Sequence, residues 1–238
     1  MKSRNWSNIS LKDFYEMQNI IAVQDDYTLY NLLDYLYDID SSNMPIQEVK
    51  QYSLSFLNDN IDDVDIDTFH DEKYDINLDI TKVSVAQFID YQNYAKEKEI
   101  RYEKILSVFV VPKGHEYNDG YSLKEVQEDI LNWQFAIVKK ISFFFRNTID
   151  NVCNSFPLLF ERGDEGGEED SGPIRQNPIA TFGIIPYVLK YCEVTNETLT
   201  NVMKESINLV FYIVSYEVVK AKEQEKQLKS IKNKIWNF

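Results

Sequence analysis

Two histidines and a run of acids are the residues whose types and spacing could support metal chemistry. His115-Glu116 matches the first half of the zinc motif H-E-x-x-H, but Asp119 stands where the second histidine belongs. The acids between Asn58 and Asp67 suggest a calcium loop, yet no frame places glycine at position six and glutamate at position twelve. We therefore expect no metal site in this chain.

Catalytic and nucleotide-binding motifs are also missing from the sequence. His70 and His115 are the only histidines, and both lie in loops beside acids. The sequence therefore offers no histidine suited to act as the general base of a catalytic triad. Gly163, Gly166 and Gly167 stand among acids that would repel a phosphate. The sequence predicts a protein that is not an enzyme and that binds no cofactor.

Clustered aromatic residues are the most conspicuous remaining feature. Phe143-Phe144-Phe145 and the segment from Phe156 to Phe160 carry more apolar bulk than one helix face can bury. One interpretation is that they fill the core between helices, and the other is that they form a groove for an apolar helix of another chain. On the second interpretation, the candidate partner-binding residues are Phe143, Phe144, Phe145, Phe156, Leu158 and Phe160.

The C-terminal segment changes character at Val218. The apolar stripe of the last helix is continuous up to Val218, whereas from Lys220 to Lys234 it thins to Leu228 and Ile231. The chain then ends in Ile235-Trp236-Asn237-Phe238. Burying a large apolar side chain is worth about 2 to 3 kcal/mol, so we expect Trp236 and Phe238 to dock, either on the rest of the chain or on a partner.

Helix signals recur along the chain. Ser10, Ser84 and Ser122 begin N-cap patterns, and apolar residues at a spacing of three to four follow each of them. We expect the helix from Ser122 to Phe144 to be continuous, the helix from Asn177 to Cys192 to kink at Pro186, and the last helix to start at Thr195. No repeat of fixed period is found. The expected helices follow Ser10, Asp26, Pro45, Ser84, Ser122, Asn177 and Thr195.

Between Asp62 and Ile80 the apolar residues alternate with acids at a spacing of two, which is typical of strands. We expect a hairpin with strands near 63–69 and 73–80. The run Ile105–Val111 fits a buried strand and a buried helical turn equally well. The predicted fold class is mainly α (α+β), a multi-helix bundle-like domain with a small β-hairpin near 63–80.

The predicted domain organisation follows from one segment of unusual composition. Residues 161–173 hold four of the seven glycines and six acids but no large apolar residue, which predicts a flexible loop. It separates a helical body with the hairpin, residues 1–160, from a C-terminal helical pair, residues 174–238, that packs on the body as part of one domain.

Composition and charge exclude several classes of protein. A 238-residue chain that is 44% hydrophobic and 14% aromatic can bury a packed core. The net charge of −14 disfavours binding to nucleic acid or anionic membranes. Residues 218–238 carry six lysines against two glutamates, a charge of +4, so the remaining residues carry −18. No secretory signal or membrane span is expected. Cys153 and Cys192 are expected to be buried free thiols.

Four segments of the chain resemble the tail assembly chaperone type proteins of phages and prophages of gut Bacteroidota. They are Asn5 to Phe14, Ile76 to Gln92, Leu106 to Val126, and Phe182 to Glu217. The most specific of them is the apolar run that leads into the Pro-Lys-Gly and Tyr-Asn-Asp-Gly turn at 112–120. The resemblance implies a factor of the host cytoplasm, absent from the virion, that engages the tape measure protein and helps to bring tail tube subunits to it.

Three classes of function follow from these observations. The leading hypothesis is a chaperone-like binding protein of virion morphogenesis, with no nucleic acid or membrane partner and an oligomeric state that the sequence does not give. The alternative is a structural component, such as a head-tail connector or tail completion protein. An acidic mimic of DNA is a weaker hypothesis, because the stretch from Asn58 to Asp79 is too short to imitate many phosphates.

Overall fold

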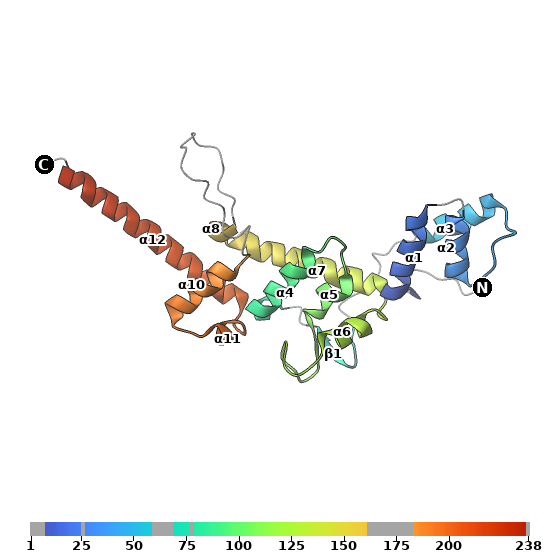
Figure 1. Cartoon of the computed structure of the whole chain (residues 1–238), viewed down its shortest axis with the longest axis horizontal. Helices are drawn as coiled ribbons and strands as arrows, with labels where there is room; N and C mark the ends of the chain where they lie inside the picture. The colour runs from blue at the N-terminus through green and yellow to red at the C-terminus, as the bar shows by residue number, and fades with distance from the viewer. Residues whose placement is uncertain (1–7, 25–26, 59–68, 77–78, 161–182, 237–238) are drawn as a thin grey trace. The chain divides into compact units, whose positions relative to one another are not determined.

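The chain forms two compact units, each built mainly from helices (Figure 1). The computed structural model describes residues 8–24, 27–58, 69–76, 79–160 and 183–236. Unit 1 consists of Met1–Ile76 and Glu97–Phe145, and unit 2 of Asn77–Lys96 and Arg146–Phe238. The mainly helical class with a small antiparallel sheet is confirmed. The predicted loop 161–173 lies outside the described residues, and the predicted domain boundaries stay predictions.

Unit 1 combines short helices with a two-stranded sheet. The serine at position 10 caps the first helix, because its hydroxyl accepts from the Asp13 N–H while the Asp13 carboxylate accepts from the Ser10 N–H. The elements are α1 (Leu11–Val23), α2 (Thr28–Tyr37), α3 (Ile46–Asn58), β1 (Tyr74–Ile76), α5 (Tyr102–Ser107), β2 (Val110–Pro112), α6 (Leu123–Ile130) and the first half of α7 (Phe135–Ser155).

The sheet pairs two segments that are distant in the sequence. Strand β1 lies inside the predicted strand 73–80, but its antiparallel partner is β2, with Tyr74 opposite Pro112 and Ile76 opposite Val110. The expected partner at 63–69 lies outside the described residues except for Phe69. The ambiguous run at 105–111 supplies both structures that it allowed, the end of α5 and the start of β2.

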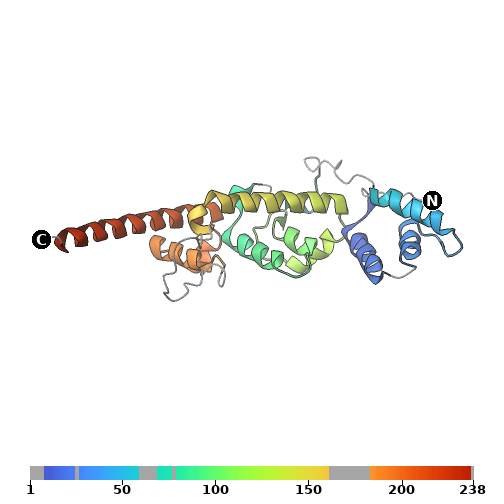
Figure 2. The ribbon, with the colours of Figure 1, turned by 90° about the horizontal axis from the view of Figure 1, so that it is seen from above.

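Unit 2 contains η2 (Ile80–Lys82), α4 (Val85–Ala95), the second half of α7, α8 (Pro157–Phe160), α10 (Ile185–Thr195), α11 (Leu199–Val202) and α12 (Ile207–Trp236). The predicted kink at Pro186 is wrong, because this proline lies in the first turn of α10, where a missing N–H costs no hydrogen bond. Residues 219–231 of α12 are all exposed, and this part of the helix extends past α10 and α11 (Figure 2).

Two helices that the sequence predicts to be continuous are broken, at 131–134 and at 203–206. In unit 1 the carbonyls of Leu131 and Trp133 accept hydrogen bonds from the N–H groups of Lys12 and Leu11, at 2.9 and 2.8 Å. A continuous helix would use these carbonyls for its own donors. The break therefore gives the first N–H groups of α1 the partners that no helix can supply to its own start.

The same arrangement occurs in unit 2. The Met203 and Glu205 carbonyls accept from the N–H groups of Ala86 and Val85, at 3.0 and 2.9 Å. A return bond completes each arrangement, from the Phe135 N–H to the Ile9 carbonyl in unit 1 (2.7 Å) and from the Ile207 N–H to the Val83 carbonyl in unit 2 (2.9 Å). We call each set of three bonds a backbone clamp.

The two clamps have related sequences. The segments Ile9–Asn19 and Val83–Asn93 share serine, phenylalanine, glutamine and asparagine at equivalent positions. Both serines form a capping box. The first halves of the two clamps are 74 residues apart (9 to 83) and the second halves 72 apart (135 to 207), so no single period describes the repeat.

Candidate functional site

The three phenylalanines at 143–145 face different surroundings in unit 1. Phe145 is fully buried and stacks on Phe109, with ring centroids 3.9 Å apart. Phe144 is half-buried and meets the Phe145 ring edge-on at 5.6 Å, whereas Phe143 is 63% exposed. Phe145 is thus part of the core of unit 1, and of the three only Phe143 presents most of its side chain to solvent.

The aromatic residues at 156–160 belong to unit 2. Phe156 and Phe160 are half-buried, and their rings lie 5.6 and 5.0 Å from the ring of Phe211, which is fully buried. Leu158 is 47% exposed. Two of the three candidates in this segment therefore build the unit 2 core together with α12, and Leu158 remains on the surface.

The two terminal candidates, Trp236 and Phe238, lie at the limit of the described residues. Trp236 is the last described residue of α12, and Phe238 lies outside the described residues. Their predicted docking stays a prediction. The part of α12 before them has an exposed apolar surface, which is relevant to the predicted docking.

Helix α12 has apolar residues on two opposite faces between Ile207 and Val219. One face is buried and carries Ile207, Val210, Phe211 and Val214, each at most 1% exposed. The opposite face carries Leu209, Tyr212, Tyr216 and Val219, which are 43%, 68%, 62% and 40% exposed. We call these four residues the outer stripe. A helix that is apolar all round normally has cover on every side.

Sequence reasoning missed the outer stripe. The spacing of three, four and three residues between its members was available as a signal, since it places all four on one helix face. The signal was hidden because the stripe interleaves with the core stripe of the same helix.

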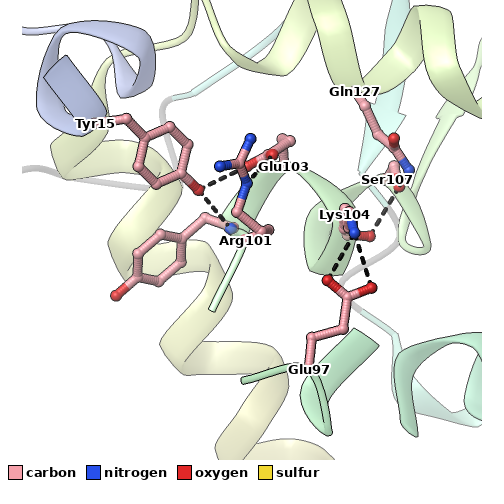
Figure 3. A network of polar contacts seen from close by, with 8 residues as sticks. Tyr15, Glu97, Arg101, Glu103, Lys104, Ser107 and Gln127 are labelled. Atoms are coloured by element: carbon pink, nitrogen blue, oxygen red, sulfur yellow. Dashed lines mark hydrogen bonds and ion pairs between the residues drawn. The ribbon is translucent and has the colours of Figure 1, made fainter. Parts of the chain in front are cut away.

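A polar network around the buried Glu103 of unit 1 joins α1 to α5 (Figure 3). The Tyr15 hydroxyl donates to Glu103 Oε2 at 2.6 Å and accepts from the Tyr102 N–H at 2.8 Å. The Arg101 Nε donates to Glu103 Oε1 at 2.9 Å, and the guanidinium lies 4.8 Å from the centre of the Tyr15 ring. Both carboxylate oxygens of the buried Glu103 are therefore paired.

The surroundings of Tyr15 hold its hydroxyl in the protonated form. Burial, together with the hydrogen bond to Glu103, raises the pKa of Tyr15 far above its ordinary value. Tyr15 therefore stays protonated and cannot serve as a base near neutral pH. A second set of bonds, from Lys104 to Glu97 at 2.6 and 2.8 Å and from Gln127 to Ser107 at 3.2 Å, continues the network along α5 (Figure 3). The arrangement holds helices together.

Asp129 of unit 1 also forms hydrogen bonds that join elements of the fold. Tyr74 and Lys73 both donate to Asp129 Oδ2, at 2.8 and 3.0 Å, and these bonds lower the pKa of Asp129. Cys153 and Cys192 are free, as expected, but half-buried, and burial raises the pKa of Cys153 to about 11.

The described residues show neither a cluster of metal ligands nor a helix that could span a membrane. No group of three or more His, Cys, Asp or Glu side chains there is arranged to hold a metal ion. His115 bonds through Nδ1 to the Asp119 carbonyl at 3.0 Å, and both residues are exposed. No described helix combines the length and the apolar character that crossing a bilayer requires.

Comparison of the chain with models of known families, with curated proteins and with solved structures gives no match. Function must therefore be inferred from the chain itself. The surface of α12 is the feature that the geometry singles out, because its apolar residues exceed what the described part of unit 2 covers.

Proposed function

We propose that this chain is a tail assembly chaperone-like protein that holds an apolar helical segment of a phage tape measure protein during virion morphogenesis. The resemblance of its four segments to such proteins suggests the partner. Tail tube subunits are a second partner that this role implies.

The observation that carries the proposal is an uncovered continuation of the α12 core stripe. Ile207 and Val214 are buried, and Ala221, Leu228 and Ile235 follow at intervals of seven residues. Leu228 is 59% exposed and its neighbour Ile231 is 53% exposed. We call Ala221, Leu228, Ile231 and Ile235 the distal seam.

A seven-residue interval has a specific physical meaning. An apolar row that recurs every seven residues stays in contact with a neighbouring helix when the two helices coil around each other. Unit 2 covers the start of the row, but the described residues do not cover Leu228 or Ile231. A helix from another protein would complete the contact, and an aggregation-prone tape measure segment has such an apolar face.

Capture of the tape measure protein by variants of the distal seam tests the proposal. The double variant Leu228→Glu, Ile231→Glu should lose co-purification with a co-expressed tape measure protein. The control Gln227→Glu, Ser230→Glu adds the same charge to exposed positions on another face of the helix and should retain it. Both variants should keep the wild-type melting temperature within a few degrees, because all four side chains are exposed. Retained capture by the seam variant would contradict the proposal.

Particle composition provides a separate test of the role. A chaperone should be absent from purified virions when their proteins are identified by mass spectrometry. Its presence at a fixed number of copies per particle would support the structural-component alternative instead.

A further inference from the structure

The outer stripe of α12 is a second uncovered surface, distinct from the distal seam. It lies on the face opposite the buried residues Ile207, Val210 and Val214, whereas the distal seam continues the buried face. Tyr212 and Tyr216 form its centre, and Leu209 and Val219 its ends. Tyrosine is enriched among residues that dominate the energy of protein interfaces. We therefore expect the outer stripe to bind a partner separate from the one that binds the distal seam.

The two backbone clamps allow one position of the outer stripe, Leu209, to be compared with its equivalent in unit 1. Phe135 and Ile207 occupy the same place in their clamps, because each donates the return hydrogen bond. Two residues further along, Ile137 in unit 1 is 7% exposed and Leu209 in unit 2 is 43% exposed. The equivalent position is thus covered in unit 1 and open in unit 2.

The geometry points to a second copy of this chain as the occupant, bound through the outer stripes in an antiparallel two-fold pair. In a two-fold interface, residue i of one copy meets residue j of the other, and j meets i. The stripe reads aliphatic, tyrosine, tyrosine, aliphatic, and its spacings of three, four and three are symmetric about residue 214. An antiparallel pair therefore places Tyr212 against Tyr216 and Leu209 against Val219 of the other copy.

Charge selects the antiparallel orientation. Residues 218–238 carry +4, and the remaining residues carry −18. A parallel pair would align the two basic segments along their whole length, and like charges at such short distances repel. An antiparallel pair sends the two basic segments to opposite ends, each toward the start of the other copy's α12. Glu197 and Glu205 lie just before the start of α12 at Ile207.

The oligomeric state of the full chain tests the pair directly. Light scattering on a size-exclusion column, over a series of loading concentrations, should show dimers of the wild type. The variant Tyr212→Glu, Tyr216→Glu should be monomeric with unchanged helical circular dichroism, because both side chains are mostly exposed. The variant Leu228→Glu, Ile231→Glu adds the same charge to the distal seam and should remain dimeric.

Either of two results would overturn the pair. The first is a monomeric wild type at every concentration, which would leave the stripe to a different protein. The second is a dimer that survives the tyrosine changes and dissociates when the distal seam is changed, which would place the contact on the other face.

Disulfide trapping tests the orientation, in a background with Cys153→Ser and Cys192→Ser. The single variants Tyr212→Cys and Tyr216→Cys should cross-link faster when mixed than either does alone, because residues 212 and 216 face each other in the antiparallel pair. Faster cross-linking of each variant with itself would show a parallel pair and overturn the antiparallel assignment.

Discussion

Units 1 and 2 fix their helices with the same backbone clamp but differ in how completely they cover the helix that follows. In unit 1, Phe145 of α7 is fully buried against Phe109, and Ile137 is 7% exposed. In unit 2, α12 begins equally well anchored through Ile207, yet its outer stripe is exposed, and so are Leu228 and Ile231 of its distal seam. Apart from the exposed Phe143, unit 1 is thus the closed unit and unit 2 the open one, and the open one is the better candidate for binding.

The units also differ in their buried charge. Glu103 of unit 1 is the buried charged side chain found among the described residues, and Tyr15 and Arg101 pair both of its oxygens. The described core of unit 2 centres on Phe211 and the rings of Phe88, Phe156 and Phe160. The buried, paired carboxylate thus belongs to unit 1, whereas aromatic packing occurs in both units, as the stack of Phe109 on Phe145 in unit 1 shows.

The largest effect is expected from the two fully buried rings at the centres of the units. Phe145→Ala and Phe211→Ala should each lower the free energy of unfolding by about 3 to 5 kcal/mol, because each leaves a cavity in a packed core. Chemical denaturation measures the change. Phe143→Ala, at a position 63% exposed, is the control and should change it by less than about 0.5 kcal/mol. A small effect of Phe211→Ala alone would show that the unit 2 core is loosely packed.

The next effect concerns the polar network around the buried Glu103 of unit 1. Tyr15→Phe removes the hydroxyl that serves Glu103 and the Tyr102 N–H, and should cost about 1 to 3 kcal/mol. The same change should reduce the loss of stability at alkaline pH. Folding raises the pKa of Tyr15, so as pH rises the unfolded chain ionises first, near its ordinary pKa of about 10, and stability is lost above that pH and not below it.

Denaturation at pH 8 and at pH values above 10 measures both parts of this prediction. Tyr27→Phe is the control, because the Tyr27 side chain is 69% exposed. An alkaline slope that Tyr15→Phe leaves unchanged would contradict the assigned role of the buried hydroxyl.

A smaller and equal effect is expected at the two capping serines. Ser10→Ala and Ser84→Ala each remove a side-chain acceptor from a capping box, which should cost about 1 kcal/mol. Hydrogen exchange should show faster exchange at the Asp13 amide in the first variant and at the Gln87 amide in the second. Markedly unequal effects would mean that the two clamps are similar in geometry but not in energy.

The smallest effect is expected on the exposed half of α12. Lys229→Gln removes an ion pair with Glu225 at 2.7 Å, between side chains that are 72% and 64% exposed. Exposed pairs of this kind contribute about 0.3 to 0.5 kcal/mol. The melting temperature should therefore barely change. A large decrease would show that this part of α12 is anchored, and the comparison between an open and a closed unit would fail.

The sequence was sufficient where a few neighbouring residues decide the outcome. The N-cap at Ser10 and the capping box at Ser84 followed from the sequence, because each serine hydroxyl accepts from the backbone N–H three residues later. The helical class followed from apolar spacing, and the strand at Tyr74–Ile76 from the alternation of apolar and acidic residues. These features need no knowledge of distant parts of the chain.

Only the tertiary structure decided the features that depend on distant partners. The helix breaks at 131–134 and 203–206 depend on distant partners, because carbonyls in them accept hydrogen bonds from N–H groups more than 100 residues away in the sequence. The pairing of β1 with β2 likewise joins distant segments, with Tyr74 opposite Pro112, and no local pattern links the two strands. Apolar residues likewise look alike in the sequence, whether the fold buries them, as it does Phe145, or leaves them open, as it does Tyr212. Burial depends on which surfaces the fold brings together, and no short stretch of sequence contains both of them.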